Sequence, residues 1–227
     1  MTLSECCSAT DRHFAAARAA KELRRYRRKG PTGTARRLLR LLEQARARVE
    51  TVLDVGGGIG VLPHELLAAG ARTALQVEAS SAYVAAARGE AERRGQADRV
   101  SIRHGDFVEL APSLPNADLV TLDRVICCYP DFERLIASSA EKALRFWAAS
   151  FPRERWFVRL SMAWENAGRA RAGNPFRTYV HPVAQVYSLL DAAGLAPLRI
   201  QRGVFWEYLL CERKPLPTGS GPRLSGG

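Results

Sequence analysis

The most constraining feature of the sequence is the run TVLDVGGGIG at residues 51–60. Its first half is rich in β-forming residues. Its second half is a glycine cluster that leads into the apolar segment 61–67, where Pro63 suits the first turn of a helix. The run therefore predicts a strand, a tight turn and a helix. Glycines in such a turn let the backbone approach a ligand, and the free N–H groups at the helix start attract a carboxylate or a phosphate.

Three classes of ligand use a turn of this kind, and the spacing separates them. A nucleoside-triphosphate loop needs a lysine followed by serine or threonine, and the turn contains no lysine. A dinucleotide turn has the pattern G-x-G-x-x-G, but counting from Gly56 places Val61 at the last glycine, and counting from Gly58 places Pro63 there. The remaining pattern is an acidic residue on the strand followed by G-x-G, here Asp54, Gly56 and Gly58.

Two further acidic residues follow predicted strands. The strand at 73–78 ends in Glu78, where the ribose of a nucleoside would extend from the glycine turn and could donate two hydroxyl groups. The strand at 99–104 runs into Asp106 and Phe107. A carboxylate that accepts from an exocyclic amine, beside a flat apolar side chain, would form a slot for a purine. The alternative at each position is a turn with a purely structural role.

Together these residues resemble the motifs of class I S-adenosylmethionine (SAM)-dependent methyltransferases. The resemblance spans about residues 51–212. It implies an α/β, Rossmann-like fold with a seven-stranded, mostly parallel sheet, an antiparallel last strand and helices on both faces. It also implies SAM as the cofactor, and no metal is expected. The cofactor-binding residues that it implies are Asp54, Gly56, Gly57, Gly58, Glu78, Ala79, Asp106, Phe107 and Asp123.

The rest of the chain supplies the other elements of this plan. The link Arg202-Gly203 is too short for a helical crossover, so the strands on either side of it should pair antiparallel. Asp131 can cap the helix that follows it. The expected helices are at 11–29, from Thr34, at 61–70, 80–94, 132–149 and 179–193, and the expected strands are at 51–55, 73–78, 99–104, 117–123, 155–160, 195–201 and 204–211.

Positive charge is concentrated near the N-terminus. The chain carries a formal charge of +11, and residues 12–48 hold 13 Lys/Arg against two Glu, so the remaining residues are neutral overall. We therefore expect a basic helical N-terminal arm or cap at 1–48, loose over its first ten residues, then a methyltransferase domain at 49–214 and a disordered tail at 215–227. The arm could close over a substrate or contact RNA phosphates, and the alternative is a solvated helical face.

Methyl transfer from SAM depends mainly on alignment and exclusion of water, so a base is optional. Where the acceptor must lose a proton, His181, Tyr129 or Asp123 could assist. The adjacent Cys127 and Cys128 could line an apolar pocket or hold a soft, thiophilic substrate. A second adjacent pair lies at residues 6–7, with the same two interpretations of unremarkable thiols or a soft-metal chelate.

The acceptor is a small molecule in our preferred interpretation. The segment 161–180 carries Trp164, Phe176 and Tyr179 and is expected to form a lid or substrate wall, which with the basic arm favours an anionic or aromatic acceptor. The motifs typical of adenine-amino and cytosine-C5 methylation are absent after the fourth strand. Residues 24–31 of the arm together with residues 123–129 resemble an uncharacterised actinobacterial methyltransferase group. The region of the fourth strand, with Tyr129-Pro130 shortly after the acidic Asp123, loosely resembles the magnesium-protoporphyrin O-methyltransferases. The alternatives are an RNA methyltransferase and a SAM-binding regulator without catalysis.

Two further patterns in the sequence bear on where in the cell the protein is located. No apolar run approaches the ~20 residues of a membrane span, and the first residues lack the pattern of a signal peptide. The five cysteines are odd in number and include adjacent pairs, which are poor disulfide partners. We expect a cytoplasmic protein with reduced thiols. The sequence leaves the oligomeric state open.

Overall fold

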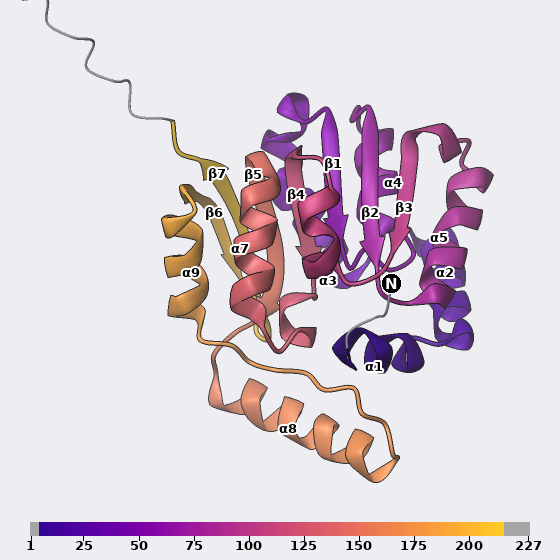
Figure 1. Cartoon of the computed structure of the whole chain (residues 1–227), viewed down its shortest axis with the longest axis vertical. Coiled ribbons are helices and arrows are strands. Elements are labelled where there is room, and N and C mark those ends of the chain that lie inside the picture. The colour runs from indigo at the N-terminus through magenta and orange to yellow at the C-terminus, as the bar shows by residue number, and fades with distance from the viewer. Residues whose placement is uncertain (1–4, 216–227) are drawn as a thin grey trace, which may run out of the picture.

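A central sheet of seven strands organises the molecule, in the order β3-β2-β1-β4-β5-β7-β6. The structure is a computed structural model that describes residues 5–215 of the chain. The first five strands run parallel, and β7 is antiparallel to both of its neighbours (Figure 1). The predicted fold class is therefore confirmed. The strands are β1 (Thr51–Val55), β2 (Thr73–Glu78), β3 (Val100–His104), β4 (Ala117–Asp123), β5 (Ala143–Pro152), β6 (Leu195–Arg202) and β7 (Trp206–Arg213).

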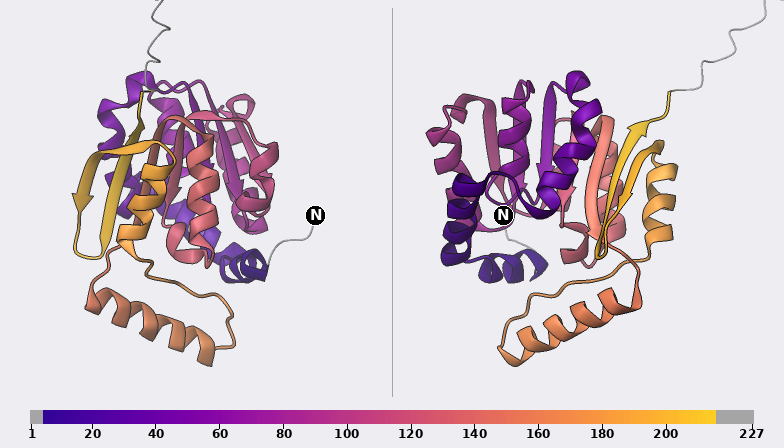
Figure 2. Two further views of the ribbon diagram at one scale, coloured as in Figure 1. Left: turned by 60° about the vertical axis from the view of Figure 1, so that its left-hand side comes forward. Right: turned by 180° about the vertical axis from the view of Figure 1, so that it is seen from behind.

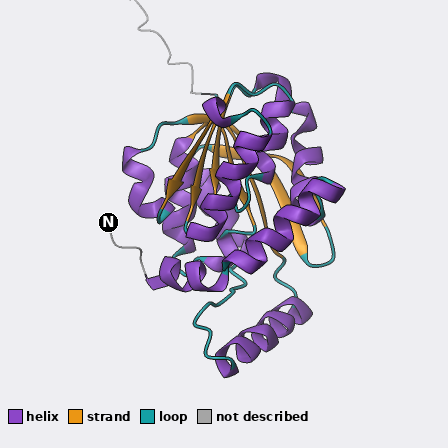
Figure 3. Cartoon of the chain, turned by 90° about the vertical axis from the view of Figure 1, so that its right-hand side faces the viewer, coloured by secondary structure: helices purple, strands orange, loops and turns teal. Residues whose placement is uncertain are grey.

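Helices cover both faces of the sheet, which is seen nearly edge-on in Figure 3. None of the helices within residues 5–215 is long and apolar enough to cross a membrane. The helices are α1 (Glu5–His13), α2 (Ala16–Lys29), α3 (Gly33–Leu41), α4 (Val61–Ala68), α5 (Ser81–Arg93), α6 (Phe107–Leu110), α7 (Phe132–Lys142), α8 (Trp156–Arg171) and α9 (Val183–Ala192).

The core has two halves because successive side chains of a strand point to opposite faces. On one face, Val52 and Leu119 pack with residues of α3 and α4, such as Leu38. On the other face, Leu53 and Val120 pack with residues of α6, α7 and α9. Since the carboxyl ends of β1 to β5 all lie at the same edge, the loops that follow these strands meet there.

The element predicted as a helix over 132–149 is in fact a helix followed by a strand. α7 ends at Lys142, and β5 begins at Ala143. The apolar residues between 135 and 147 fit a helical period, but β5 is inserted between β4 and β7 and is buried almost throughout. Pairing with both neighbouring strands therefore overrides the local pattern.

The strand predicted at 155–160 is wrong for a related reason. With β5 already occupying that place in the sheet, residues from Trp156 onward form α8, whose second half contains two Ala and two Arg, which favour helix. The predicted loop at 161–180 is consequently half helical, with an extended segment from 172 to 182. In Figures 1 and 2, α8 stands outside the body of the molecule.

The N-terminal arm is helical but differs in detail from the prediction. Residues 5–10 belong to α1 rather than to a loose segment, and the helix predicted at 11–29 is interrupted at Phe14 and Ala15. α3 begins at Gly33, with Thr32 at the N-cap position, and the hydroxyl of Thr34 donates to Asp123 instead of capping the helix. The division at residue 48 stays a prediction. Of the predicted tail, residues 216–227 lie outside the described residues.

Candidate functional site

The glycine turn after β1 is built for close backbone approach. Gly56 and Gly58 have positive φ angles of 62° and 57°, which favour glycine. A Cβ atom on Gly57 would lie 2.3 Å from Oδ2 of Asp54, so a side chain is excluded there too. The N–H group of Gly56 donates to the carbonyl oxygen of Val77 over 2.8 Å, which ties the turn to β2.

Asp54 lies beneath this turn and is only 1% exposed. Its Oδ1 accepts a hydrogen bond of 2.5 Å from the hydroxyl of Thr121 on β4, whereas its Oδ2 has no partner among the described residues. Burial raises the pKa of Asp54 to about 8, and repulsion from Asp123 and Glu78 adds to the shift. A buried carboxylate with one unused oxygen is suited to a cationic ligand group.

Glu78 connects the end of β2 to the same turn. Its Oε2 accepts from the N–H of Gly58 and its Oε1 from the N–H of Ser80, both over 2.8 Å. Burial raises the pKa of Glu78, while these backbone donors oppose the rise. Each of the two carboxylate oxygens can accept a second hydrogen bond. Together they can therefore still accept from two hydroxyl groups, one on each oxygen.

Gln76 is a residue of this site that the sequence analysis missed. It is fully buried, and its Nε2 donates to the carbonyl oxygen of Gly58 over 2.7 Å. Its place is set by the sheet, because it is paired in register with Asp54. A glutamine within an otherwise apolar strand was the available signal.

Asp106 follows β3 and caps α6, since its Oδ1 accepts from the N–H of Val108 over 2.9 Å. The hydroxyl of Tyr129 donates to its carboxylate, 3.0 Å from each oxygen. Phe107 beside it is buried. Ala79 lies at the neighbouring strand end, where its carbonyl oxygen is 3.0 Å from Nε2 of His104. Two of the predicted site residues, Asp106 and Tyr129, therefore contact each other directly.

Asp123 stands at the end of β4 and is half-buried. Its Oδ2 accepts from the hydroxyl of Thr34 over 2.9 Å, and its Oδ1 accepts from that of Ser150 over 2.5 Å. The next residue, Arg124, has a positive φ of 62°, and its N–H donates to the Ser150 hydroxyl over 3.0 Å. The arm, β4 and β5 thus jointly fix the orientation of this carboxylate.

His181 contacts the backbone of the loop that follows β4. Its Nε2 lies 3.0 Å from the carbonyl oxygen of Ile126 and 3.1 Å from that of Tyr129, so the ring donates to the backbone. The ring also stacks on Phe132 with centroids 4.1 Å apart. Burial lowers the pKa of His181, although the two carbonyl groups oppose this. These contacts hold the loop after β4 in place.

Cys127 and Cys128 belong to that loop, in the short 3₁₀ helix Ile126–Cys128. Their sulfur atoms are 3.7 Å apart, and both thiols donate to the carbonyl oxygen of Arg124. The side chains of the other adjacent pair, at residues 6–7, lie outside the described part of the chain.

A cover formed by His13, Phe14, Asn174 and Phe176 joins the arm to the segment after α8. His13 stacks on Phe176 at 4.3 Å between ring centroids, and its Nδ1 lies 2.9 Å from Nδ2 of Asn174. Phe14 packs edge-on against Phe176, and its carbonyl oxygen accepts from the Ser80 hydroxyl over 2.8 Å. The cover is therefore anchored beside Glu78. Sequence analysis predicted a lid but not these partners.

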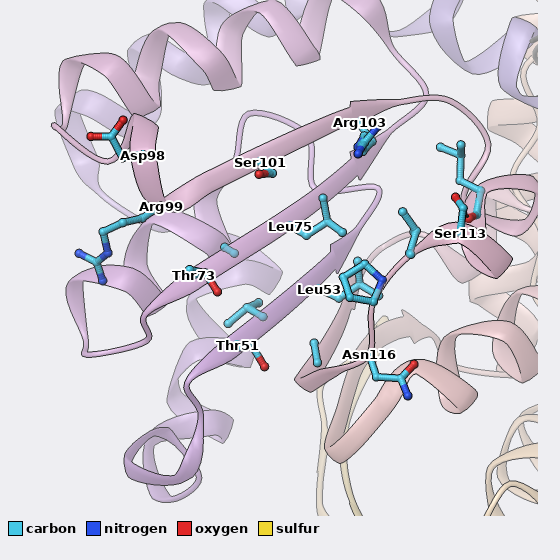
Figure 4. Close-up of a pocket in the computed structure, with 16 residues that line it drawn as sticks. Thr51, Leu53, Thr73, Leu75, Asp98, Arg99, Ser101, Arg103, Ser113 and Asn116 are labelled. Carbon is cyan, nitrogen blue, oxygen red and sulfur yellow. Dashed lines mark hydrogen bonds between the residues drawn. The ribbon is translucent and has the colours of Figure 1, made fainter.

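A separate groove of about 450 Å³ lies on the face of β1, β2 and β3 (Figure 4). It is open because α6, which follows β3, has only four residues. None of the predicted site residues lines this groove. Its lining includes Leu53, Thr73, Leu75, Ser101, Arg103 and Asn116.

Comparisons with known proteins agree with the fold. Residues 52–147 match the family model of a methyltransferase domain. Magnesium protoporphyrin IX methyltransferase from Synechocystis PCC 6803, with bound S-adenosylhomocysteine (SAH), matches at 19% identity over 92% of this chain and 100% of that chain, with a TM-score of 0.69. The same protein with bound SAM matches at 18% identity over 94% and 100%, with a TM-score of 0.64.

An O-methyltransferase family protein from Burkholderia thailandensis is also similar, at 18% identity over 80% of this chain and 57% of that chain, with a TM-score of 0.63. No curated protein matches the sequence. Because the solved structures share less than 20% of their residues with this chain, they establish only its fold. The family model adds that residues 52–147 match a methyltransferase domain. The strand order and the matched domain together give the chain a class I methyltransferase fold, similar to that of magnesium protoporphyrin IX methyltransferase, whose structures contain SAH or SAM.

Proposed function

We propose that the protein transfers the methyl group of SAM to a small-molecule acceptor through an oxygen, nitrogen or sulfur nucleophile. The observation that carries the proposal is the direct hydrogen bond from Gly58 to Glu78, above a buried Asp54 with an unused oxygen. This arrangement fits the carboxylate, ammonium and ribose groups of SAM. The free thiols of Cys127, Cys128 and Cys211 suit a reducing cytoplasm.

The proposed binding roles follow the chemistry of each group. Asp54 attracts the ammonium group from below the turn, and the N–H groups around Gly57 face the carboxylate. Glu78 accepts from the ribose hydroxyls through its remaining lone pairs. Asp106 accepts from the adenine amine, with Phe107 and Ala79 beside the ring. Bound SAM supplies an electrophilic methyl group on a sulfonium.

Asp123 is the proposed proton acceptor where the acceptor molecule must lose a proton. It lies at the carboxyl edge of the sheet, and the hydroxyls of Thr34 and Ser150 hold it in one orientation. Tyr129 uses its hydroxyl proton on Asp106, so we assign it to the adenine side. His181 is assigned to positioning the loop, because its Nε2 already binds two carbonyl groups.

An anionic acceptor is favoured by the cations around the opening. Nη1 of Arg18 lies 2.5 Å from Nε2 of His13 in the cover, and burial together with Arg18 and Arg169 lowers the pKa of His13 to about 4. Arg124 and Arg169 also help to lower the pKa of Cys128, after the stronger influence of Cys127. Arg169 further lies over the ring of Phe176, 5.4 Å from its centroid. An acceptor that is both aromatic and anionic would match this surface.

The proposal is tested by incubating the protein with methyl-labelled SAM and a cell extract that is then separated into RNA, protein and metabolite fractions. Label in the metabolite fraction is the expected result. Glu78→Gln serves as the control, since it should weaken donor binding and so reduce the label when SAM is limiting. Label in RNA alone would replace the small-molecule acceptor with an RNA acceptor, and tight SAM binding without any transfer would indicate a regulator.

A further inference from the structure

Helix α8 uses only one of its faces to contact the rest of the protein. Val158 is its only fully buried residue among those described. Asn166 donates to the carbonyl oxygen of Thr178 over 2.7 Å, and Arg169 lies over Phe176. These contacts attach the helix to the segment 172–182, which runs between α8 and the sheet (Figures 1 and 2). The opposite face of α8 points away from the molecule.

That outward face is apolar and strongly exposed. Trp156, Leu160 and Trp164 recur every four residues and so share one side of the helix, and they are 76%, 59% and 76% exposed. A buried tryptophan contributes several kcal/mol to stability, whereas these two contribute almost nothing to the fold. Their placement therefore calls for a partner beyond the described residues 5–215.

The apolar surface continues onto the turn between β6 and β7. Phe157 packs edge-on against Phe205 with centroids 5.6 Å apart, and the N–H of Arg153 donates to the carbonyl oxygen of Phe205 over 2.8 Å. Val204 and Phe205 are 69% and 43% exposed. We call this surface the tryptophan patch. It consists of Trp156, Phe157, Leu160, Trp164, Val204 and Phe205.

Among the described residues, cations outnumber carboxylates at the border of the tryptophan patch, since Arg155, Arg159 and Arg171 lie beside it against Glu154. Arg171 follows Trp164 by two helical turns and lies on the same side of α8, and Arg159 lies beside Trp156. The two glutamates nearby are neutralised: Glu154 accepts from Arg159 over 2.5 Å, and Glu165 on the opposite face accepts from Arg169 over 2.7 Å.

We propose that the tryptophan patch binds the surface of a membrane that contains anionic phospholipids. Tryptophan favours the boundary between acyl chains and headgroups, and arginine is attracted to anionic headgroups. A second copy of the chain is the competing occupant, and it is distinguished in the test by its oligomeric state. α8 lies on the membrane and does not span it. The proposal is independent of the acceptor.

The test compares sedimentation of the full chain with vesicles of phosphatidylcholine alone and with vesicles that also contain phosphatidylglycerol. We expect binding to the second kind, weakening as salt is added, with a blue shift of tryptophan fluorescence. Trp156→Ala/Trp164→Ala and Arg171→Glu should each weaken vesicle binding about tenfold or more, since ~1.4 kcal/mol corresponds to a factor of ten.

Matched controls lie at the opposite edge of the sheet, where Leu144 is exposed at the start of β5 and Arg72 precedes β2. Leu144→Ala and Arg72→Glu should bind vesicles like the unaltered chain. Thermal unfolding should be nearly unchanged in all four variants, because every altered side chain is exposed. Equal binding to both kinds of vesicle, unchanged binding by the patch variants, or a dimer that depends on Trp156 and Trp164 would overturn the proposal.

Discussion

Glu78 is satisfied by the backbone before any ligand arrives. The N–H groups of Gly58 and Ser80 hold its two oxygens, so the carboxylate shapes the glycine turn as well as facing the ligand. We predict that Glu78→Gln weakens the binding of SAM and SAH by at least about tenfold, or ~1.4 kcal/mol, because an NH₂ group must then face a backbone N–H. Isothermal titration calorimetry measures the change.

Glu109 provides a matched control, since it is exposed on α6 close to Asp106. Glu109→Gln should leave the affinity for SAH unaltered and should unfold at the same temperature as the unaltered chain. If Glu78→Gln also bound SAH with full affinity, the binding role of Glu78 would be rejected.

Asp54 gives the site a dependence on pH. Its pKa of about 8 exceeds the value of an unfolded aspartic acid, so the folded protein retains a proton that the unfolded chain has lost. The free energy of unfolding should therefore fall as pH rises from about 4 to about 8, with no further loss from this group above that range. We predict that Asp54→Asn removes this part of the slope in urea denaturation across the same pH range. An unchanged slope would contradict the pKa shift.

At the scale of elements, the sequence predicts strands best where the pattern is local. β2 and β4 begin and end where their alternation and flanking residues indicate, at 73–78 and 117–123. β5 was missed because its apolar residues fit a helix as well as a buried strand, and only pairing with β4 and β7 decides between them. The start of α8 was therefore wrongly predicted as a strand at 155–160, because β5 occupies that position in the sheet.

The residues of the candidate site also differ in whether the local sequence indicates them. Asp54, Glu78 and Asp106 could be proposed from the sequence because each lies in or just after a recognisable strand, near a turn signal. Thr121 and Gln76 could not, because their roles come from neighbours across the sheet that are far apart in sequence. Sheet register, rather than any local motif, brings them beneath the glycine turn.

A further prediction concerns the contact within the cover between the arm and the segment after α8. Phe176→Ala removes the ring that packs against His13 and Phe14, which is worth about 0.5–1.5 kcal/mol beyond the buried area. Dissociation of SAH should accelerate by roughly three- to tenfold, as followed by stopped-flow fluorescence. Phe205→Ala, an exposed ring without contact to the arm, should leave the rate unchanged. Equal rates in both variants would mean that the cover does not retain the ligand.

At the scale of the whole molecule, the arm is continuous with the core. Leu38 of α3 is fully buried in the same cluster as Leu119 and Phe146. We predict that Leu38→Ala lowers the free energy of unfolding of the entire chain by about 2–5 kcal/mol, with one cooperative transition in urea. Leu39→Ala, at a half-buried position, should cost clearly less. A separate early transition confined to the arm would show instead that residues 1–48 unfold on their own.

The two sides of the cover lie far apart in the sequence, since His13 and Asn174 are separated by 161 of the 227 residues. During synthesis the glycine turn and the first four strands leave the ribosome long before Phe176 does. A nascent chain can thus shape its nucleoside-binding loops early, but it can enclose a ligand only when translation is nearly finished.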